Sequence, residues 1–92
     1  MRISFDPAKR DATFAERGFA FEDAVEVFAG ATYDLEDDRQ DYGETCMITV
    51  GWLRGRMVIV VWTPRDELRH VISMRKANDR EQARYRQRLE QG

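Results

Sequence analysis

The sequence predicts an α+β fold in which two N-terminal helices pack on a mainly antiparallel sheet that is followed by a C-terminal helix. The 92 residues, 42% of them apolar, suffice for one compact core, so we expect a single domain over residues 1–92. Helix signals fill residues 6–30, whereas strand and turn signals fill residues 31–75. Helices gathered on one face of an antiparallel sheet bury the apolar sides of both, which gives the predicted order β-α-α-β-β-β-β-α.

The first predicted strand covers residues 2–5, and a helix follows from Pro7 to about Arg17. Asp6 supplies an N-cap oxygen, and proline fits the first helical position because its missing N–H has no partner there. Gly18 ends the helix because glycine readily adopts the left-handed conformation of a C-cap. The side that we expect to face the sheet is formed by Ala8, Ala12, Phe14 and Ala15.

A second helix is predicted from about Phe21 to Phe28. Its apolar residues recur at the spacing of one helix face. Ala20 offers no capping side chain, so the start of this helix is weakly specified, and Gly30 ends it. The expected apolar stripe consists of Phe21, Ala24, Val25 and Phe28.

Four strands are predicted in the second half of the chain. Residues 31–38 alternate apolar and acidic positions, which is typical of an edge strand, and residues 39–44 form a loop. Residues 45–53 and 57–63 form a hairpin around Arg54-Gly55. The second strand of this hairpin is apolar on both faces and is therefore expected at the centre of the sheet.

The last strand is predicted at residues 68–75, after a turn at residues 64–67. Asn78 and Glu81 have the spacing of a capping box, which opens a helix that runs to about Leu89. Strict alternation along the strand assigns four residues to each face. We expect Leu68, His70, Ile72 and Met74 to face the helices, and Arg69, Val71, Ser73 and Arg75 to lie on the open face.

The charge is unevenly distributed, although its sum is only −2. Residues 1–51 carry 5 basic and 12 acidic side chains, a net charge of −7, and residues 52–92 carry 10 basic and 5 acidic ones, a net charge of +5. The distribution is therefore a better guide to partners than the sum. The basic half indicates a nucleic-acid partner, while the alternative that both halves are only solvated faces stays open on charge alone.

Several protein classes are excluded by composition. No apolar run approaches the ~20 residues of a membrane span, and the first ten residues lack the apolar centre of a signal peptide, so we expect a cytoplasmic protein without membrane contact. One histidine and one cysteine cannot assemble a structural zinc site, and a Gly-rich phosphate loop is missing. We therefore expect no metal and no organic cofactor. Cys46 lies in an apolar run and is interpreted as a buried, inert thiol.

Arg75 is the strongest candidate for a functional side chain. It lies at the end of a strand beside Lys76, where a guanidinium can bind two phosphate oxygens at once. The alternative is that Arg75 pairs with a carboxylate such as Glu81 and only fixes the junction between strand and helix. Arg69 shares the predicted face and is a further phosphate-binding candidate.

Four other residues are candidates for proton transfer, each beside a structural alternative. His70 has a suitable ordinary pKa, but its predicted face favours a half-buried histidine at the margin of the sheet. Glu44 enters the central hairpin from a loop and is the better base candidate, unless it is an idle surface carboxylate. Lys9 opposes the helix dipole, which is weak support for a role. Tyr85 either stacks on a base or covers the sheet, and packing is the favoured interpretation.

The chain resembles the BrnT family of type II toxins, small ribonucleases with a RelE-like fold. The resemblance runs through nearly the whole chain in the right order. It is carried by Phe5-Asp6-Pro7-Ala8-Lys9, by Gly18 to Ala24 with Val27-Phe28, by Asp38-Arg39 and Asp41 to Glu44, by Ile48 to Gly51, and by Ile72 to Ala77 with Glu81 and Tyr85. Two departures are Arg17-Gly18, where relatives have His-Gly, and Ala20, where relatives have a serine cap. A role of that histidine does not transfer, although Arg17 can still bind phosphate.

The resemblance implies an endoribonuclease that works without metal and leaves a 2′,3′-cyclic phosphate. For this reaction our hypothesis assigns Arg75, Arg39 and Lys76 to the phosphate and the charge of the transition state. Glu44 is the favoured base, and Lys9, His70 or Tyr85 is the proton donor. It also implies a BrnA-like ribbon-helix-helix antitoxin in a hetero-oligomer, expected to be a heterotetramer, with DNA contacted only through the antitoxin. The other hypothesis is a non-catalytic RNA- or protein-binding module of the same fold.

Overall fold

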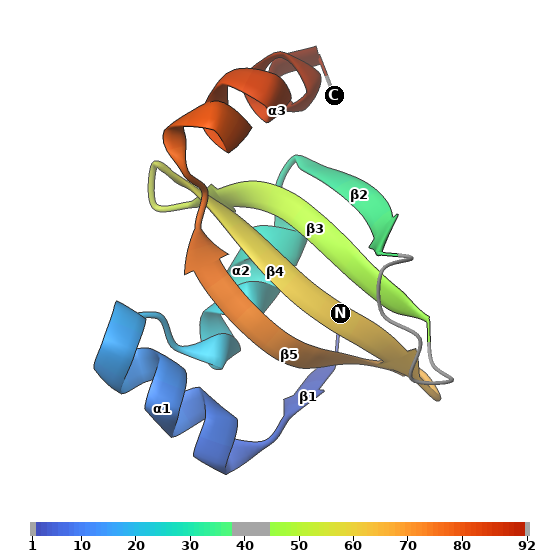
Figure 1. The fold of residues 1–92 in the computed structure, drawn as a ribbon. Helices are drawn as coiled ribbons and strands as arrows, with labels where there is room; N and C mark the ends of the chain where they lie inside the picture. The colour runs from blue at the N-terminus through green and yellow to red at the C-terminus, as the bar shows by residue number, and fades with distance from the viewer. Residues whose placement is uncertain (1, 38–44, 92) are drawn as a thin grey trace.

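The computed structural model describes residues 2–37 and 45–91, which form a five-stranded sheet with helices against both faces (Figure 1). The strands lie in the order β1-β5-β4-β3-β2; β1 runs parallel to β5, and the other pairs are antiparallel. The predicted α+β class and element order are confirmed. The elements are β1 (Ile3–Phe5), α1 (Pro7–Arg17), the 3₁₀ turn η1 (Phe21–Asp23), α2 (Ala24–Ala29), β2 (Thr32–Asp37), β3 (Cys46–Leu53), β4 (Arg56–Arg65), β5 (Leu68–Lys76) and α3 (Asp79–Gln91).

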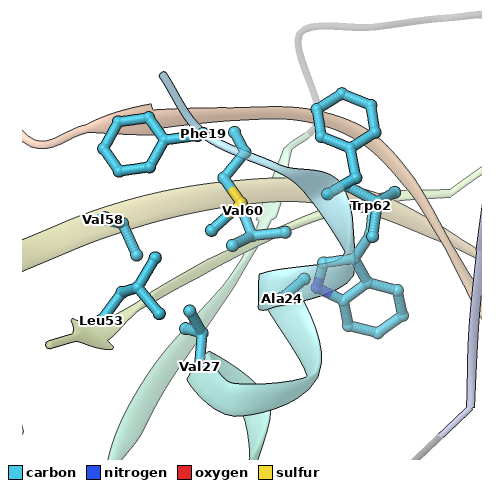
Figure 2. Packing of buried hydrophobic residues seen from close by; sticks show 10 residues of the cluster. Phe19, Ala24, Val27, Leu53, Val58, Val60 and Trp62 are labelled. Carbon is cyan, nitrogen blue, oxygen red and sulfur yellow. The ribbon is translucent and has the colours of Figure 1, made fainter. Parts of the chain in front are cut away.

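The larger core lies between α2 and the sheet (Figure 2). Ala24 and Val27 of α2 meet the central strand β4, whose Val58 and Val60 are fully buried on this face. Trp62 closes one end of the cluster and packs edge-on against Phe28 at 5.9 Å between ring centroids. The remaining members of the cluster are Phe19, Phe21, Leu53, Val71 and Met74.

The second helical segment begins as a 3₁₀ turn, which changes the predicted apolar stripe. Phe21 and Ala24 are buried as expected, but Val25 is 40% exposed and Val27 is fully buried. A 3₁₀ turn has three residues per turn, so the residues after it are rotated relative to a continuous α-helix. The inward side chains accordingly recur every third residue. Ala20 makes no side-chain capping bond, as predicted.

The predicted bounds and caps of α1 are confirmed, but its predicted inward face is wrong. Asp6 Oδ1 accepts from the Ala8 N–H at 2.9 Å, and Gly18 is left-handed at φ 75°. However, all of α1 is described and none of its residues is buried; Phe14 is 50% exposed. The methyl groups of Ala8, Ala12 and Ala15 bury little apolar area, so they give a weak drive toward the sheet. The helix is held at the sheet margin by polar contacts instead, among them Arg10 with Glu22 at 2.8 Å.

The central position predicted for residues 57–62 is confirmed, because β4 is the middle strand of the sheet. Its hairpin with β3 turns at Arg54-Gly55, and both residues have positive φ. The strand runs on to Arg65, so the turn before β5 is confined to Asp66-Glu67, shorter than the predicted turn at residues 64–67. Cys46 is buried, as predicted.

A β-bulge in β5 overturns half of the predicted face assignment. Val61 pairs with Ser73 but Trp62 pairs with Val71, which leaves Ile72 as an extra residue. After the bulge the alternation is as predicted, with Met74 in the α2-side core. Before the bulge the two faces are exchanged, so that Val71, predicted on the open face, lies in the α2-side core.

The exchange moves two candidate site residues. Arg69 lies on the α2 side, where its guanidinium is 4.6 Å from the Phe28 ring centroid and 4.3 Å from that of Trp62. His70 lies on the opposite side. The predicted open face with Arg69, Ser73 and Arg75 together is therefore wrong for Arg69.

The C-terminal helix α3 covers part of the other face of the sheet. Its capping box is formed as predicted: the Glu81 N–H donates to Asn78 Oδ1 at 2.8 Å, and the Asn78 N–H donates to Glu81 Oε1 at 3.0 Å. Leu89 and Ala77 are buried there in a second cluster with Val50, Met57 and Ile59. No helix within the described residues is long and apolar enough to cross a membrane.

The edge strand β2 is present as predicted, with Asp34 and Glu36 exposed. Asp34 Oδ1 accepts a hydrogen bond of 2.7 Å from the buried Thr49 hydroxyl, which in turn accepts from the Trp62 indole N–H at 2.8 Å. This chain of bonds ties the edge strand to the core. The predicted loop at 39–44 lies outside the described residues.

Candidate functional site

A pocket of about 330 Å³ lies where α3 meets the sheet face opposite α2. Strands β2 to β5 form its floor and one wall, and α3 forms the other wall. It therefore brings together basic side chains of β5 and α3, which belong to the basic half of the chain, and acidic side chains of the edge strand β2. Its lining residues are Leu35, Glu36, Asp37, Ile48, Ile59, Arg75, Glu81, Arg84 and Tyr85.

Arg75 reaches this pocket from the end of β5 and is bound by Glu81 of α3. Its two terminal nitrogens donate to the two carboxylate oxygens of Glu81 at 2.7 and 2.8 Å. This is a bidentate, charge-assisted pair, the strongest geometry available to a guanidinium and a carboxylate. The side chain of Arg75 remains 39% exposed. The pairing of Arg75 with Glu81, which the sequence left open as an alternative, is therefore present. Arg75 also lines the pocket.

Glu81 links three parts of the site. It accepts from Arg75, caps α3 through Asn78, and lines the pocket itself. The hydrogen bonds from Arg75 lower the pKa of the Glu81 carboxyl below its ordinary value, against the opposing effect of burial, and the Asn78 N–H adds to the lowering. Glu81 is therefore ionised at neutral pH.

The lowered pKa of Glu81 predicts an acid-sensitive α3. A carboxylate whose folded pKa is depressed contributes stability above its unfolded pKa of about 4.3, and that contribution is lost as the pH falls through the folded pKa. Thermal unfolding by circular dichroism should show wild type losing stability below about pH 4.3 more steeply than Glu81→Gln. The glutamine keeps the capping acceptor but has no proton to gain. Parallel pH profiles would contradict this prediction.

Tyr85 joins the pocket to the second core cluster. It is half-buried and packs beside Tyr33 of β2, with 5.8 Å between ring centroids. The packing role favoured from the sequence is confirmed. Two arginines of α3 contact these rings: Arg84 lies 5.7 Å from the Tyr85 centroid, and Arg88 lies 4.9 Å from the Tyr33 centroid. Tyr85 thus brings an aromatic ring and a phenol to the pocket beside Arg84.

The structure separates His70 from Arg75, although both lie on the same side of the sheet. His70 pairs with Ser4 across the β1–β5 edge, where its Nδ1 lies 2.9 Å from the serine hydroxyl. It is half-buried, as the structural interpretation expected. Four residues of β5 lie between His70 and Arg75, so the two positions are five residue steps apart, roughly 16 Å along the strand. They cannot act on the same phosphate.

The other cationic candidates lie away from the pocket. Lys76 is exposed and follows Arg75, so its side chain starts from the opposite face of β5. Lys9 and Arg17 belong to α1; Lys9 is exposed, and Arg17 Nη1 donates to the Met74 carbonyl at 3.4 Å. None of the three lines the pocket. Arg39 and Glu44 lie outside the described residues.

Sequence reasoning missed Arg84, Glu36 and Asp37 as pocket residues. The signal for Arg84 was its position four residues from Arg80 and Arg88 and next to Tyr85. The acids of β2 gave no signal, because an acidic edge strand is typical of protected sheet edges in general. Within residues 2–37 and 45–91, no three His, Cys, Asp or Glu side chains converge as a metal site.

Comparison with known proteins points to one family. The family model described as "Ribonuclease toxin, BrnT, of type II toxin-antitoxin system" matches residues 5–81. Among solved structures, the chain is similar to the crystal structure of the Brucella abortus ribonuclease toxin BrnT, with 27% sequence identity and a TM-score of 0.69. That similarity covers 86% of this chain and 99% of the Brucella chain. A comparison with curated protein sequences gives no match.

Proposed function

The chain belongs to the BrnT family of ribonuclease toxins of type II toxin-antitoxin systems. We propose that it cleaves RNA at the α3 pocket without a metal ion, by transferring the phosphoryl group from the 5′ oxygen to the neighbouring 2′-hydroxyl. The observation that supports this most directly is the pocket itself. It holds two guanidiniums, a phenol and carboxylates within one concave site. These are the groups that such a transfer requires.

The proposed reaction balances with two proton transfers. A base removes the proton of the 2′-hydroxyl, the 2′ oxygen attacks the adjacent phosphorus, and the bond from phosphorus to the 5′ oxygen breaks. An acid then gives a proton to the 5′ oxygen. The products are a 2′,3′-cyclic phosphate and a 5′-hydroxyl. Negative charge accumulates on the phosphorane oxygens, where fixed cations lower the barrier.

Arg75 and Arg84 are the proposed phosphate ligands among the described residues. Arg75 is held on a strand end by Glu81, so its position is largely fixed before RNA binds. A preorganised cation stabilises the transition state without the cost of reorienting it during the reaction. The two guanidiniums supply positive charge at the place where other nucleases use a divalent ion. Arg39 stays a candidate from the sequence alone.

Tyr85 is the proposed proton donor, because of the three donor candidates Lys9, His70 and Tyr85, all of them described, it is the one that lines the pocket. Its phenol lies beside the guanidinium of Arg84, 5.7 Å from the ring centroid. Glu44 stays the base candidate of the sequence. Asp37, on the same side of β2 as Tyr33 and Leu35 and part of the pocket lining, is the base candidate among the described residues.

The family membership implies an antitoxin partner. We propose that this partner is a BrnA-like ribbon-helix-helix protein and that residues 1–92 act as one toxin domain in the cytoplasm, where RNA is the substrate. The positive charge of residues 52–92 is in keeping with an RNA-binding surface.

The proposal predicts RNA cleavage in the presence of a chelator. Purified protein is incubated with a labelled oligoribonucleotide in excess EDTA, and the 3′ ends of the products are tested for cyclic phosphate by the phosphatase activity of polynucleotide kinase. We expect cleavage at an unchanged rate, and none of a fully 2′-O-methylated oligonucleotide, which lacks the attacking hydroxyl. Cleavage that requires Mg²⁺ would contradict the mechanism, and RNA binding without cleavage would favour the non-catalytic module.

A further inference from the structure

Three arginines of α3 form a row along one side of the helix. Arg80, Arg84 and Arg88 are spaced by four residues, and all three are exposed. Residues at this spacing lie one above another on a helix surface. The rise between neighbours is about 6 Å, so the row extends over roughly 12 Å. We call these three residues the arginine row.

The arginine row has no acidic partner within the described part of the chain. Three arginines elsewhere in the fold do form ion pairs: Arg10 with a glutamate of η1, Arg54 with Asp23, and Arg75 with a glutamate of α3. The helix contains Asp79 and Glu90, which at about 100° of rotation per residue lie off the side of the row, and Glu81, which is bonded to Arg75. Among the described residues, the row is therefore a local concentration of positive charge without ion pairs of its own, and its member Arg84 shares the pocket with the carboxylates of Glu36, Asp37 and Glu81.

Two members of the row are held in place by aromatic rings. Arg84 lies against Tyr85, and Arg88 lies against Tyr33 while its Nη1 donates to the Tyr33 hydroxyl at 2.9 Å. Rings that restrict a guanidinium reduce the side-chain entropy lost when it binds a ligand. A guanidinium has five N–H donors, so a single bond to a phenol leaves Arg88 able to bind phosphate.

We propose that the arginine row is a phosphate-binding track for single-stranded RNA that leads into the α3 pocket through Arg84. This proposal rests on the proposed function and adds a second binding site to it. Guanidinium forks fit phosphate oxygens, and a positively charged surface that follows the backbone is the common basis of single-strand binding. Arg84 belongs to both the row and the pocket wall, which makes the two sites continuous.

The surface around the row fits RNA better than a protein partner. Protein interfaces have an apolar centre that is depleted of charge. Within the described residues, the exposed large apolar side chains are Phe14 and Val25, which lie on α1 and α2, not on α3. Ala83 and Gln87, the exposed neighbours of the row, provide little apolar area.

The test removes the two members of the row that lie outside the pocket. Binding of a fluorescein-labelled, fully 2′-O-methylated oligoribonucleotide is measured by fluorescence anisotropy at several salt concentrations, so that cleavage does not interfere. For single strands, the logarithm of the binding constant falls by about 0.7 per phosphate contact for each tenfold increase in salt concentration. The double variant Arg80→Gln/Arg88→Gln should therefore bind more weakly, with a salt slope smaller by about 1.4.

The matched control is Arg56→Gln/Arg86→Gln, which removes the same charge from exposed positions on β4 and on another side of α3. It should keep the slope of the wild type. Equal slopes in all three proteins, or equal losses in both double variants, would overturn the track. Lost binding of the co-expressed antitoxin with unchanged RNA binding would also overturn it and assign the row to that protein.

Folding and function are checked separately. If circular dichroism shows the double variant unfolded, Arg80→Gln alone carries the test, with an expected slope change of about 0.7. The ring and hydroxyl contacts that hold Arg88 are those of Tyr33, and this single variant leaves them intact. A wild type that binds RNA through the row but cleaves none refutes the proposed function and leaves the track standing. A wild type that cleaves RNA while the slopes stay equal refutes the track alone.

Discussion

Arg75→Ala is expected to slow RNA cleavage by a factor on the order of 10²–10³, the usual effect of removing one preorganised charge from a transition state. The reason is the location of the guanidinium, on the wall of the α3 pocket and fixed by two bonds to Glu81. The measurement is the single-turnover cleavage rate of a labelled oligoribonucleotide, together with growth after induced expression. Toxicity should be nearly abolished.

Glu81→Gln separates a role in catalysis from a role in folding. If Arg75 only fixed the junction between β5 and α3, breaking the pair from either side would have similar consequences. If Arg75 binds the phosphate, the glutamine variant should lose less than about tenfold in rate, equivalent to about 1.4 kcal/mol. Glutamine also preserves the capping box. Equal losses in the two variants, or unchanged growth arrest by Arg75→Ala, would refute the assignment.

Phe21→Ala is expected to destabilise the fold by about 3–5 kcal/mol, the usual cost of removing a fully buried phenylalanine. Phe21 is 0% exposed and packs edge-on against Phe5 at 5.9 Å, so the deletion leaves a cavity between η1 and the sheet. For a chain of this length, this corresponds to a fall in Tm of more than roughly 12 °C. Urea denaturation followed by tryptophan fluorescence measures the change in free energy of unfolding.

Phe14→Ala is the matched control, because it makes the same chemical change on a side chain that is 50% exposed. The guanidinium of Arg10 lies 5.0 Å from the Phe14 ring centroid, and exposed cation–π pairs contribute about 0.5–1 kcal/mol. We expect a loss of no more than about 1 kcal/mol. A loss comparable to that of Phe21→Ala would restore the inward-facing Phe14 predicted from the sequence and contradict the observed position of α1.

The sequence predicted most element bounds because their causes are local. Asp6 and Gly18 set the ends of α1 through the backbone groups of their own turns. The capping box of α3 likewise involves residues only three positions apart. The central place of β4 followed from its lack of a polar face, which requires cover on both sides.

The sequence could not determine which side chains face one another across the sheet. A single extra residue in β5 exchanges the two faces of the strand before it, and the alternation of apolar and polar residues does not indicate such a bulge. Arg69 was therefore expected beside Arg75, and His70 was expected opposite it. The pairing of Arg75 with Glu81 was foreseen as an alternative because both flank one junction.

Sequence patterns alone were enough to predict the α+β class, the order of the elements, the caps of α1 and α3, and the family. The folded chain was needed to show that α1 lies at the sheet margin, that Arg69 lies away from the pocket, and that Arg84 and Tyr85 line it. The two sets of features differ in the range of the interactions that cause them. Caps, turns and helix periods depend on neighbouring residues, whereas the pocket depends on strand register and on where α3 crosses β2, and both are fixed by burial across the whole molecule.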